Sequence, residues 1–228
     1  MESMVQEKAE KSVAIQTSGK KTYFYRCSKR MIDVACSFLG LLALSPVLLL
    51  CAVAVHLEDG GPVLYRQERV GKDYRKFFIY KFRSMRMNAD QIHEELRREY
   101  GSTEVSFKLK DEEDPRITKV GRVLRRWNLD ELPQLLNILE GDMSLVGPRP
   151  LPVYEAEEER RRYGFKYQKR YQVPQGLTCY WQISRRSEVE FGDRMQLDVD
   201  YAEDCSLGLD LSLIIRTALY TVVGKSSY

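Results

Sequence analysis

The feature that most constrains this chain is an apolar segment, Val34 to Leu57, that contains no Asp, Glu, Lys or Arg. As a helix, about 24 residues measure roughly 36 Å, which is enough to cross a bilayer. A helix buried in a water-soluble domain would need polar residues at helical spacing on its outer face, and this segment has almost none. A cleavable signal peptide is a poor match, because the segment starts late and no small-residue cleavage site follows it. The sequence therefore predicts a membrane anchor.

Ser45 and Pro46, in the middle of the segment, leave two anchor geometries open. Pro46 lacks an N–H and should bend a helix, and Ser45 can hydrogen-bond the carbonyl that is freed. Basic residues flank the segment on both sides: Lys20, Lys21, Arg26, Lys29 and Arg30, then Arg66, Arg69, Lys72, Arg75 and Lys76. Basic residues on both sides are typical of a membrane segment whose two ends both lie in the cytoplasm. The preference of basic residues for the cytoplasmic side is weaker when a long domain follows the segment. The residues alone favour a re-entrant helix over a full span only slightly.

Composition limits the remaining function classes. The formal net charge is only +3, so we expect no nucleic-acid partner. The five cysteines form no Cys-x-x-Cys pair and two lie inside the apolar segment, which indicates reduced thiols rather than a disulfide framework. With two histidines in the chain, a structural zinc site is not expected.

We expect the chain to divide into a flexible tail (1–28), the membrane anchor (29–58) and a domain outside the membrane (59–228). A β-hairpin is predicted over 63–68 and 76–83, because a Gly-Lys-Asp turn signal separates two runs rich in β-branched and aromatic residues. Helices are predicted over 88–100, 117–127, 130–140 (opened by Asp130), 152–163, around 191–199, and from Asp210 onward. We expect a helix-rich α+β fold with amphipathic helices at the membrane surface. The acidic run 111–114 is interpreted as a solvated loop rather than a metal site.

Two neighbouring carboxylates, Asp130 and Glu131, follow a basic stretch that includes Arg125. Asp is a preferred N-cap and Glu suits the first turn of a helix, so spacing alone favours a structural role for the pair. Two properties favour chemistry instead. Neighbouring carboxylates can bind Mg²⁺ while leaving room for phosphates, and arginines pair with phosphate oxygens.

Four motifs, in order along the chain, resemble those of the bacterial sugar transferases known as monotopic phosphoglycosyl transferases. They are Lys81-Phe82-Arg83-Ser84-Met85, 114–121 (DPRITKVG), 129–135 (LDELPQL) and 141–150 (GDMSLVGPRP). The similarity runs from about Lys29 to the C-terminus, without the multi-helix N-terminal membrane domain of longer relatives. We therefore expect a chain close to the minimal catalytic unit.

The resemblance implies transfer of a sugar phosphate from a UDP-sugar to a polyprenyl phosphate, usually undecaprenyl phosphate, with release of UMP. It implies that Asp130 is the nucleophile, that Asp130 and Glu131 form a Mg²⁺ site, and that Ser45-Pro46 turns the anchor back to the cytoplasmic face of the bacterial inner membrane. Lys81 and Arg125 match basic family positions and are assigned to orienting Asp130 and the phosphates, with ordinary surface charges as the alternative. Substrate-side candidates are Arg83, Pro148, Arg149, Pro150, Gln182 and Arg186.

Two departures from the family pattern concern the loop near Gln175-Gly176 and the pair Arg185-Arg186, and they leave sugar selection open. UDP-glucose or UDP-galactose is the expected donor, with an N-acetylated amino sugar as the close alternative. Membrane lipids are expected partners, and the oligomeric state stays open, with a homodimer as one alternative. Competing hypotheses are an inactive membrane-anchored scaffold and a direct glycosyltransferase that releases UDP.

Overall fold

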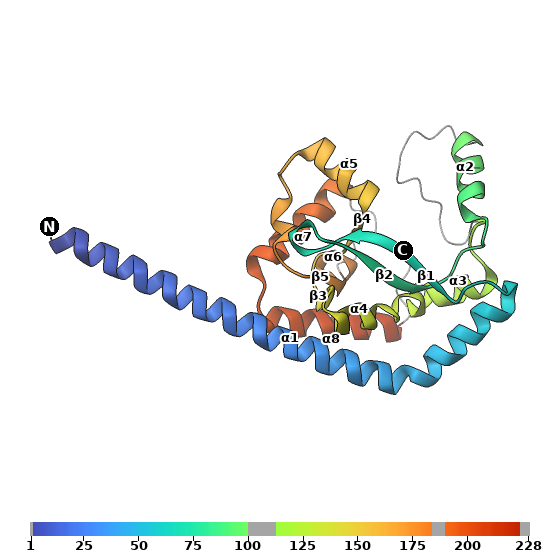
Figure 1. Ribbon diagram of the computed structural model, residues 1–228, viewed down its shortest axis with the longest axis horizontal. Helices are drawn as coiled ribbons and strands as arrows, with labels where there is room; N and C mark the ends of the chain where they lie inside the picture. Colours follow the sequence, from blue (N-terminus) through green and yellow to red (C-terminus); the bar gives the residue numbers. More distant parts are fainter. Residues whose placement is uncertain (1, 100–112, 184–189, 224–228) are drawn as a thin grey trace.

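The structure is a computed structural model that describes residues 2–99, 113–183 and 190–223. One long helix, α1 (Glu2–Asp59), runs along one edge of a small α+β domain (Figure 1). The helix-rich α+β class is therefore confirmed. The other helices are α2 (Ala89–Glu99), α3 (Lys119–Arg126), α4 (Gln134–Glu140), α5 (Val153–Tyr163), α6 (Tyr180–Ile183), α7 (Phe191–Asp204) and α8 (Leu207–Val223).

The first part of α1 differs from the expected tail. Residues predicted as a flexible tail (1–28) are helical from Glu2 onward, and the part before Tyr23 extends away from the domain in Figure 1. The Tyr25 hydroxyl already contacts the domain, donating to Asp210 Oδ2 at 2.9 Å. The stretch lacks proline and is rich in Ala, Glu, Lys and Gln, which favour helix even without an apolar stripe. The helix also continues without a break into the predicted anchor.

The middle of α1 shows the predicted proline bend. Pro46 cannot donate to the carbonyl of Leu42, and the Ser45 hydroxyl donates to that carbonyl instead, at 2.8 Å. Figure 1 shows α1 changing direction along its length so that it follows the edge of the domain. The predicted bend and its local hydrogen bond are both confirmed.

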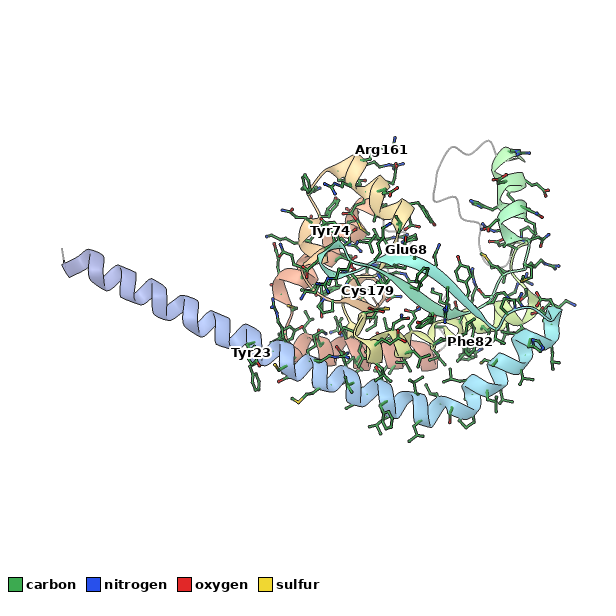
Figure 2. The ribbon with its side chains drawn as sticks, in the orientation of Figure 1. Tyr23, Glu68, Tyr74, Phe82, Arg161 and Cys179 are labelled. Atoms are coloured by element: carbon green, nitrogen blue, oxygen red, sulfur yellow. The ribbon has the colours of Figure 1, made fainter. Side chains whose placement is uncertain are left out.

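The apolar part of α1 presents a long hydrophobic face outward. Among the described residues, one helical stretch, Tyr23–Asp59, is long and apolar enough to cross a membrane, and most of it is exposed. Figure 2 shows side chains of this stretch projecting away from the domain. The large exposed side chains along it include Phe38, Leu39, Leu42, Leu49, Leu50 and Leu57.

The predicted hairpin is confirmed as β1 (Leu64–Val70) and β2 (Lys76–Phe82), which pair antiparallel around the short 3₁₀ helix η1 (Lys72–Tyr74). A two-residue strand, β4 (Leu151–Pro152), adds to the free edge of β1. Phe77 and Ile79 are buried while Phe78 is exposed, so alternate residues of β2 face the core. By the same alternation, Lys81 lies on the inner face.

Helix α4 packs against that inner face. Leu135 and Ile138 join Phe77, Ile79 and Met143 in one buried cluster. Asn137, which is fully buried, accepts a hydrogen bond from the Tyr80 amide at 2.9 Å and donates to the Phe78 carbonyl at 2.7 Å. These two bonds fix α4 to the edge of β2 and so place the residues before α4 beside Lys81.

A second sheet that the sequence did not predict completes the domain. Strand β3 (Met143–Val146) pairs in parallel with β5 (Gln175–Thr178), and α8 packs on both strands. Helix α8 begins at Leu207 rather than at Asp210, so the predicted cap at Asp210 was wrong. Asp210 is instead buried and accepts hydrogen bonds from Lys29 and Tyr201, at 2.8 and 2.6 Å.

Candidate active site

The Asp130–Glu131 pair lies on an irregular turn between two helices. Helix α3 ends at Arg126, Asn128 adopts a left-handed conformation (φ 52°), and residues Leu129–Glu131 form the 3₁₀ helix η2. Helix α4 begins after Pro133, so the interpretation of Asp130 as its N-cap was wrong. Both carboxylates are buried, each with a relative exposure of 8%. Burying an ionised carboxylate costs free energy unless nearby cations offset the loss of water.

Two cations meet at Glu131. Lys81 Nζ donates to Glu131 Oε1 at 2.6 Å, and Arg149 Nη2 donates to the same oxygen at 2.7 Å. Lys81 comes from the inner face of β2 and Arg149 from the turn after β3, so three separate elements converge on one carboxylate. The structure thus brings together four predicted site residues: Asp130, Glu131, Lys81 and Arg149.

The two neighbouring carboxylates have opposite pKa shifts. Burial tends to raise the pKa of Glu131, but Arg149 and Lys81 outweigh it and hold this pKa far below its usual value. Burial raises the pKa of Asp130, with Lys81 opposing the rise and the Glu131 charge adding to it. Burial also lowers the pKa of Lys81, and Glu131 opposes that shift. A permanently charged Glu131 beside a more basic Asp130 suits different roles for the two.

The turn that carries Arg149 is held by two arginines that the sequence did not single out. Arg69 donates to the Pro150 carbonyl at 2.9 Å, and the fully buried Arg170 donates to the Arg149 carbonyl at 2.7 Å. Burial, then the nearby Arg149 charge, lowers the pKa of Arg69 to about 10. Pro148 and Pro150, two predicted site residues, bracket Arg149 and are buried. No local motif distinguishes Arg69 or Arg170 from other surface-type arginines in the sequence.

Arg170 is held in turn by buried acids. Its Nη2 lies 2.8 Å from Asp198 Oδ2, and its Nη1 lies 3.6 Å from Glu159 Oε2. Gln175, one of the residues that departs from the family pattern, donates from its side-chain amide to the Arg170 carbonyl at 3.0 Å. The loop that departs from the family pattern therefore holds Arg170, which in turn holds the Arg149 carbonyl.

Backbone hydrogen bonds to strand β5 also fix the turn that carries Arg149. The Gly176 amide donates to the Pro148 carbonyl at 2.8 Å, and the Gly147 amide donates to the Thr178 carbonyl at 3.0 Å. A Cβ added at Gly176 would lie 2.1 Å from the Gly147 nitrogen, which no side chain can tolerate without backbone movement. Glycine is required at Gly176 for this approach.

We expect Gly176→Ala to lower the free energy of unfolding by about 2–3 kcal/mol, because overpacking would force β5 away from the Arg149 turn. The matched control is Gly208→Ala, where an added Cβ would meet nothing within 4 Å, and its change should stay within about 0.5 kcal/mol. Unfolding of both variants followed in detergent would show the difference. Equal stabilities would contradict the close contact.

The remaining predicted residues surround the site less directly. Arg125 donates through Nε to Ser84 Oγ at 3.0 Å, and its charge opposes the rise in the Asp130 pKa. Arg83 pairs with Asp59 at the end of α1. Gln182 accepts from the Cys179 amide at 2.9 Å, while Arg186 lies outside the described residues.

Trp181 is a further residue that the motifs did not indicate. It is buried, and the guanidinium carbons of Arg149 and Arg194 lie 6.0 and 5.2 Å from its ring centroid. Cation–π attraction to the Trp181 ring stabilises the positions of both guanidinium groups. Trp181 therefore helps to orient the Arg149 side chain toward Glu131.

The donor set at the site suits a metal that needs few protein ligands. Within the part of the chain that the structure describes, no cluster of three or more His, Cys, Asp or Glu side chains could hold a metal. Mg²⁺ keeps several waters and is commonly bound by one or two carboxylates together with substrate phosphates. Asp130 and Glu131 fit that requirement, whereas they would not form a complete protein cage for Ca²⁺ or Zn²⁺.

Comparisons with known proteins agree with the motifs. The chain is 39% identical over 206 residues to the galactosyl transferase CpsE of Streptococcus agalactiae, covering 90% of this chain and 44% of that protein. It is 40% identical over 205 residues to the exopolysaccharide production protein ExoY of Sinorhizobium fredii, covering 88% of each. It is 40% identical over 210 residues to the undecaprenyl-phosphate galactose phosphotransferase of Salmonella typhimurium, covering 89% of this chain and 42% of that protein.

These relatives fall into two length classes. The chain spans less than half of CpsE and of the Salmonella protein, and most of ExoY. The model of the bacterial sugar transferase family matches residues 24–224, which include α1 from within its first half, both sheets and the Asp130–Glu131 site. The chain belongs to the bacterial sugar transferase family.

Proposed function

We propose that this protein transfers a sugar-1-phosphate from a UDP-sugar to a polyprenyl phosphate, such as undecaprenyl phosphate, and releases UMP. The observation that carries the proposal is the buried Asp130–Glu131 pair, enclosed by Lys81 and Arg149, in a domain packed on a membrane-length apolar helix. Family membership agrees, since relatives are named as undecaprenyl-phosphate galactose or glucose phosphotransferases. The product would begin a lipid-linked glycan, as expected for exopolysaccharide, capsule, O-antigen or glycoprotein synthesis.

The chemistry assigns separate roles to the two carboxylates. An Asp130 oxygen attacks the sugar-linked phosphorus of the UDP-sugar, the phosphoanhydride bond breaks, and UMP leaves with the bridging oxygen. The sugar phosphate is then held on Asp130 until an oxygen of the polyprenyl phosphate attacks the same phosphorus and restores the free carboxylate. Glu131, kept ionised by Lys81 and Arg149, does not compete as a nucleophile, because its pKa lies far lower.

The surrounding cations match the charge of the substrates. Lys81, Arg149 and Arg125 lie around the two carboxylates, and a diphosphate brings negative charge that they can stabilise. Asp130 and Glu131 would hold a Mg²⁺, and this ion would supply further charge neutralisation for the leaving UMP. The sugar is not specified by these contacts, so UDP-glucose, UDP-galactose and an N-acetylated amino sugar stay as donor candidates.

We propose a re-entrant anchor on the cytoplasmic face of the bacterial inner membrane, and the contacts of α1 support the return of the segment to the side on which it began. Before the apolar segment, Asp33 accepts a hydrogen bond from the Leu145 amide at 2.9 Å; after it, Glu58 accepts from the Lys119 amide at 2.7 Å. Both ends of the segment thus contact one domain. A straight spanning helix would separate its ends by the full bilayer, about 30 Å, and one water-exposed domain would not reach both.

Further apolar side chains lie along the same edge of the domain as α1. Helix α8 runs beside α1 in Figure 1 and exposes Leu211, Ile215 and Leu219. Trp127, after α3, and Leu136, on α4, are also partly exposed. We propose that these side chains enter the headgroup region, as amphipathic interfacial helices do. In Figure 2, Arg161 on α5 lies at the opposite side of the domain, which favours a solvated role for the arginine run there.

The assay that tests the function combines the full chain in lipid or detergent with Mg²⁺, polyprenyl phosphate and a panel of UDP-sugars. We expect UMP to be released, and we expect repeated turnover only when polyprenyl phosphate is present. Release of UDP would favour a direct glycosyltransferase. If no nucleotide appears with any UDP-sugar of the panel, the membrane-anchored scaffold becomes the better hypothesis.

For the re-entrant topology, we expect a tag placed before residue 20 and a tag at the C-terminus to be protected from a membrane-impermeant label in intact cells. Both tags should react after the cells are permeabilised, which is the control for accessibility. The reason is that both ends of the apolar segment contact the same domain. Labelling of the first tag from outside intact cells would overturn this topology.

A further inference from the structure

Pro46 divides α1 into two arms, and each arm carries a charged side chain that caps a different helix of the domain. On the arm after Pro46, Glu58 accepts hydrogen bonds from the amides of Lys119 (2.7 Å) and Val120 (3.1 Å), at the beginning of α3. A carboxylate is favoured there, because the first amides of a helix lack intrahelical partners and carry the positive end of the helix dipole.

The arm before Pro46 makes the complementary contact. Arg30 donates to the carbonyls of Ile138 (2.5 Å) and Leu139 (2.9 Å), in the last turn of α4. A cation is favoured there for the opposite reason, since the last carbonyls of a helix are unpaired and carry negative partial charge. A guanidinium suits this contact because its fork can reach two carbonyls at once.

The segment between these two caps contains the nucleophile. Helix α3, the η2 turn with Asp130, and α4 form one continuous stretch, capped by Glu58 at one end and by Arg30 at the other. Helix α1 contacts both α3 and α4. Arg30 and Glu58 lie on opposite sides of the bend at Pro46.

We propose that Glu58 and Arg30 are positioning residues, through which the membrane anchor holds Asp130 in place for attack on the sugar-linked phosphorus. This inference rests on the proposed function. Two of the three cations assigned to the substrate phosphates, Lys81 and Arg149, lie on β2 and on the turn after β3, outside the capped segment, while Arg125 lies on α3 within it. Loosening a cap should therefore displace Asp130, while Lys81 and Arg149 keep their places on elements outside the segment.

The test measures steady-state UMP release by Glu58→Ala and Arg30→Ala in the full chain with Mg²⁺, polyprenyl phosphate and the preferred UDP-sugar. We expect kcat to fall about tenfold with KM for the UDP-sugar unchanged within twofold, because small misplacements of a reacting group reduce the rate strongly. Glu58→Gln and Arg30→Lys keep part of each hydrogen-bonding pattern, so their kcat should lie between those of the alanine variants and the wild type.

Matched controls are Arg26→Ala, one turn earlier on α1, and Glu95→Ala on α2, both at exposed positions, which should retain wild-type kcat. Rates are expressed per folded enzyme, from unfolding measured in the same detergent. If an alanine variant does not fold, the milder variant at that position must still lose at least about twofold in kcat at constant KM.

Three results would overturn the proposal: wild-type kcat in both capping variants, a rise in KM at constant kcat, or an equal loss in the controls. A wild-type enzyme that releases no UMP would instead contradict the proposed function itself. Active wild type with unaffected capping variants would leave the function standing and remove only the positioning role.

Discussion

Asp130→Asn should abolish turnover, with UMP release falling on the order of 10⁴-fold or more, because the amide cannot act as the attacking oxygen nucleophile. The side chain keeps its size in the buried η2 turn, so the fold should survive. The variant should also fail to form a covalent sugar-phosphate adduct when the UDP-sugar is supplied without polyprenyl phosphate. Mass spectrometry of the intact protein, with a donor labelled in the sugar, measures that adduct directly.

The matched control for this substitution is Asp204→Asn, which makes the same chemical change at an exposed aspartate at the end of α7, outside the four motifs. It should retain wild-type turnover and adduct. An adduct that survives in Asp130→Asn would place the nucleophile elsewhere. Loss of turnover with an intact adduct would assign Asp130 to the second step only.

The second large effect is expected for Arg149→Ala. This change removes a 2.7 Å ion pair from a buried carboxylate, while Lys81 stays hydrogen-bonded to the same oxygen. We expect kcat/KM to fall about 10²- to 10³-fold, since a preorganised charge near the reacting phosphates is lost in a site that excludes water. Arg149→Lys should recover only part of this loss, because an ammonium group cannot reproduce the planar fork.

The same variant should change the pH dependence of the reaction. Arg149 lowers the pKa of Glu131 and opposes the rise in the pKa of Asp130. Without this charge, both carboxyl groups protonate at higher pH, so the activity that is lost on acidification should begin to fall at a higher pH than in the wild type. The pH profile of kcat/KM measures the shift. A shift of the acid limb to lower pH would contradict the assignment.

The control for both measurements is Arg161→Ala. Arg161 is an exposed arginine on α5 that pairs with Glu158, and surface pairs of this kind contribute little. It lies at the far side of the domain from α1 in Figure 2. Its activity and pH profile should match those of the wild type. An equal loss in Arg161→Ala would indicate a general effect of positive charge rather than a local contact at Glu131.

Local patterns predicted much of the fold. Two runs rich in β-branched and aromatic residues and a Gly-Lys-Asp turn located the β1–β2 hairpin, and Pro152 and Gly164 marked the limits of α5. These elements follow from near-neighbour effects, namely side-chain periodicity and the special backbone of glycine and proline. The short strands β3, β4 and β5 escaped prediction. Each depends on a partner far away in the chain, and none is long enough to show a clear period.

The two capping assignments that failed have a common reason. Asp130 and Asp210 both have the residue type and position of helix N-caps, yet each is buried and located by tertiary contacts. The cations near Asp130 come from β2 and from the turn after β3, and the Lys29 that contacts Asp210 comes from α1. A sequence pattern records which residues are adjacent in the chain, but not which distant charges will surround them.

By itself, the sequence determined the long apolar segment with its bend at Ser45-Pro46 and the set of motifs that belong to the bacterial sugar transferase family. These features need only composition, spacing and local hydrogen bonding. The tertiary structure alone decided that Arg69 and Arg170 hold the Arg149 turn, and that Glu58 and Arg30 cap the helices on either side of Asp130. Those contacts join residues far apart in the chain, so they exist only once the sheet, helices and anchor have packed together.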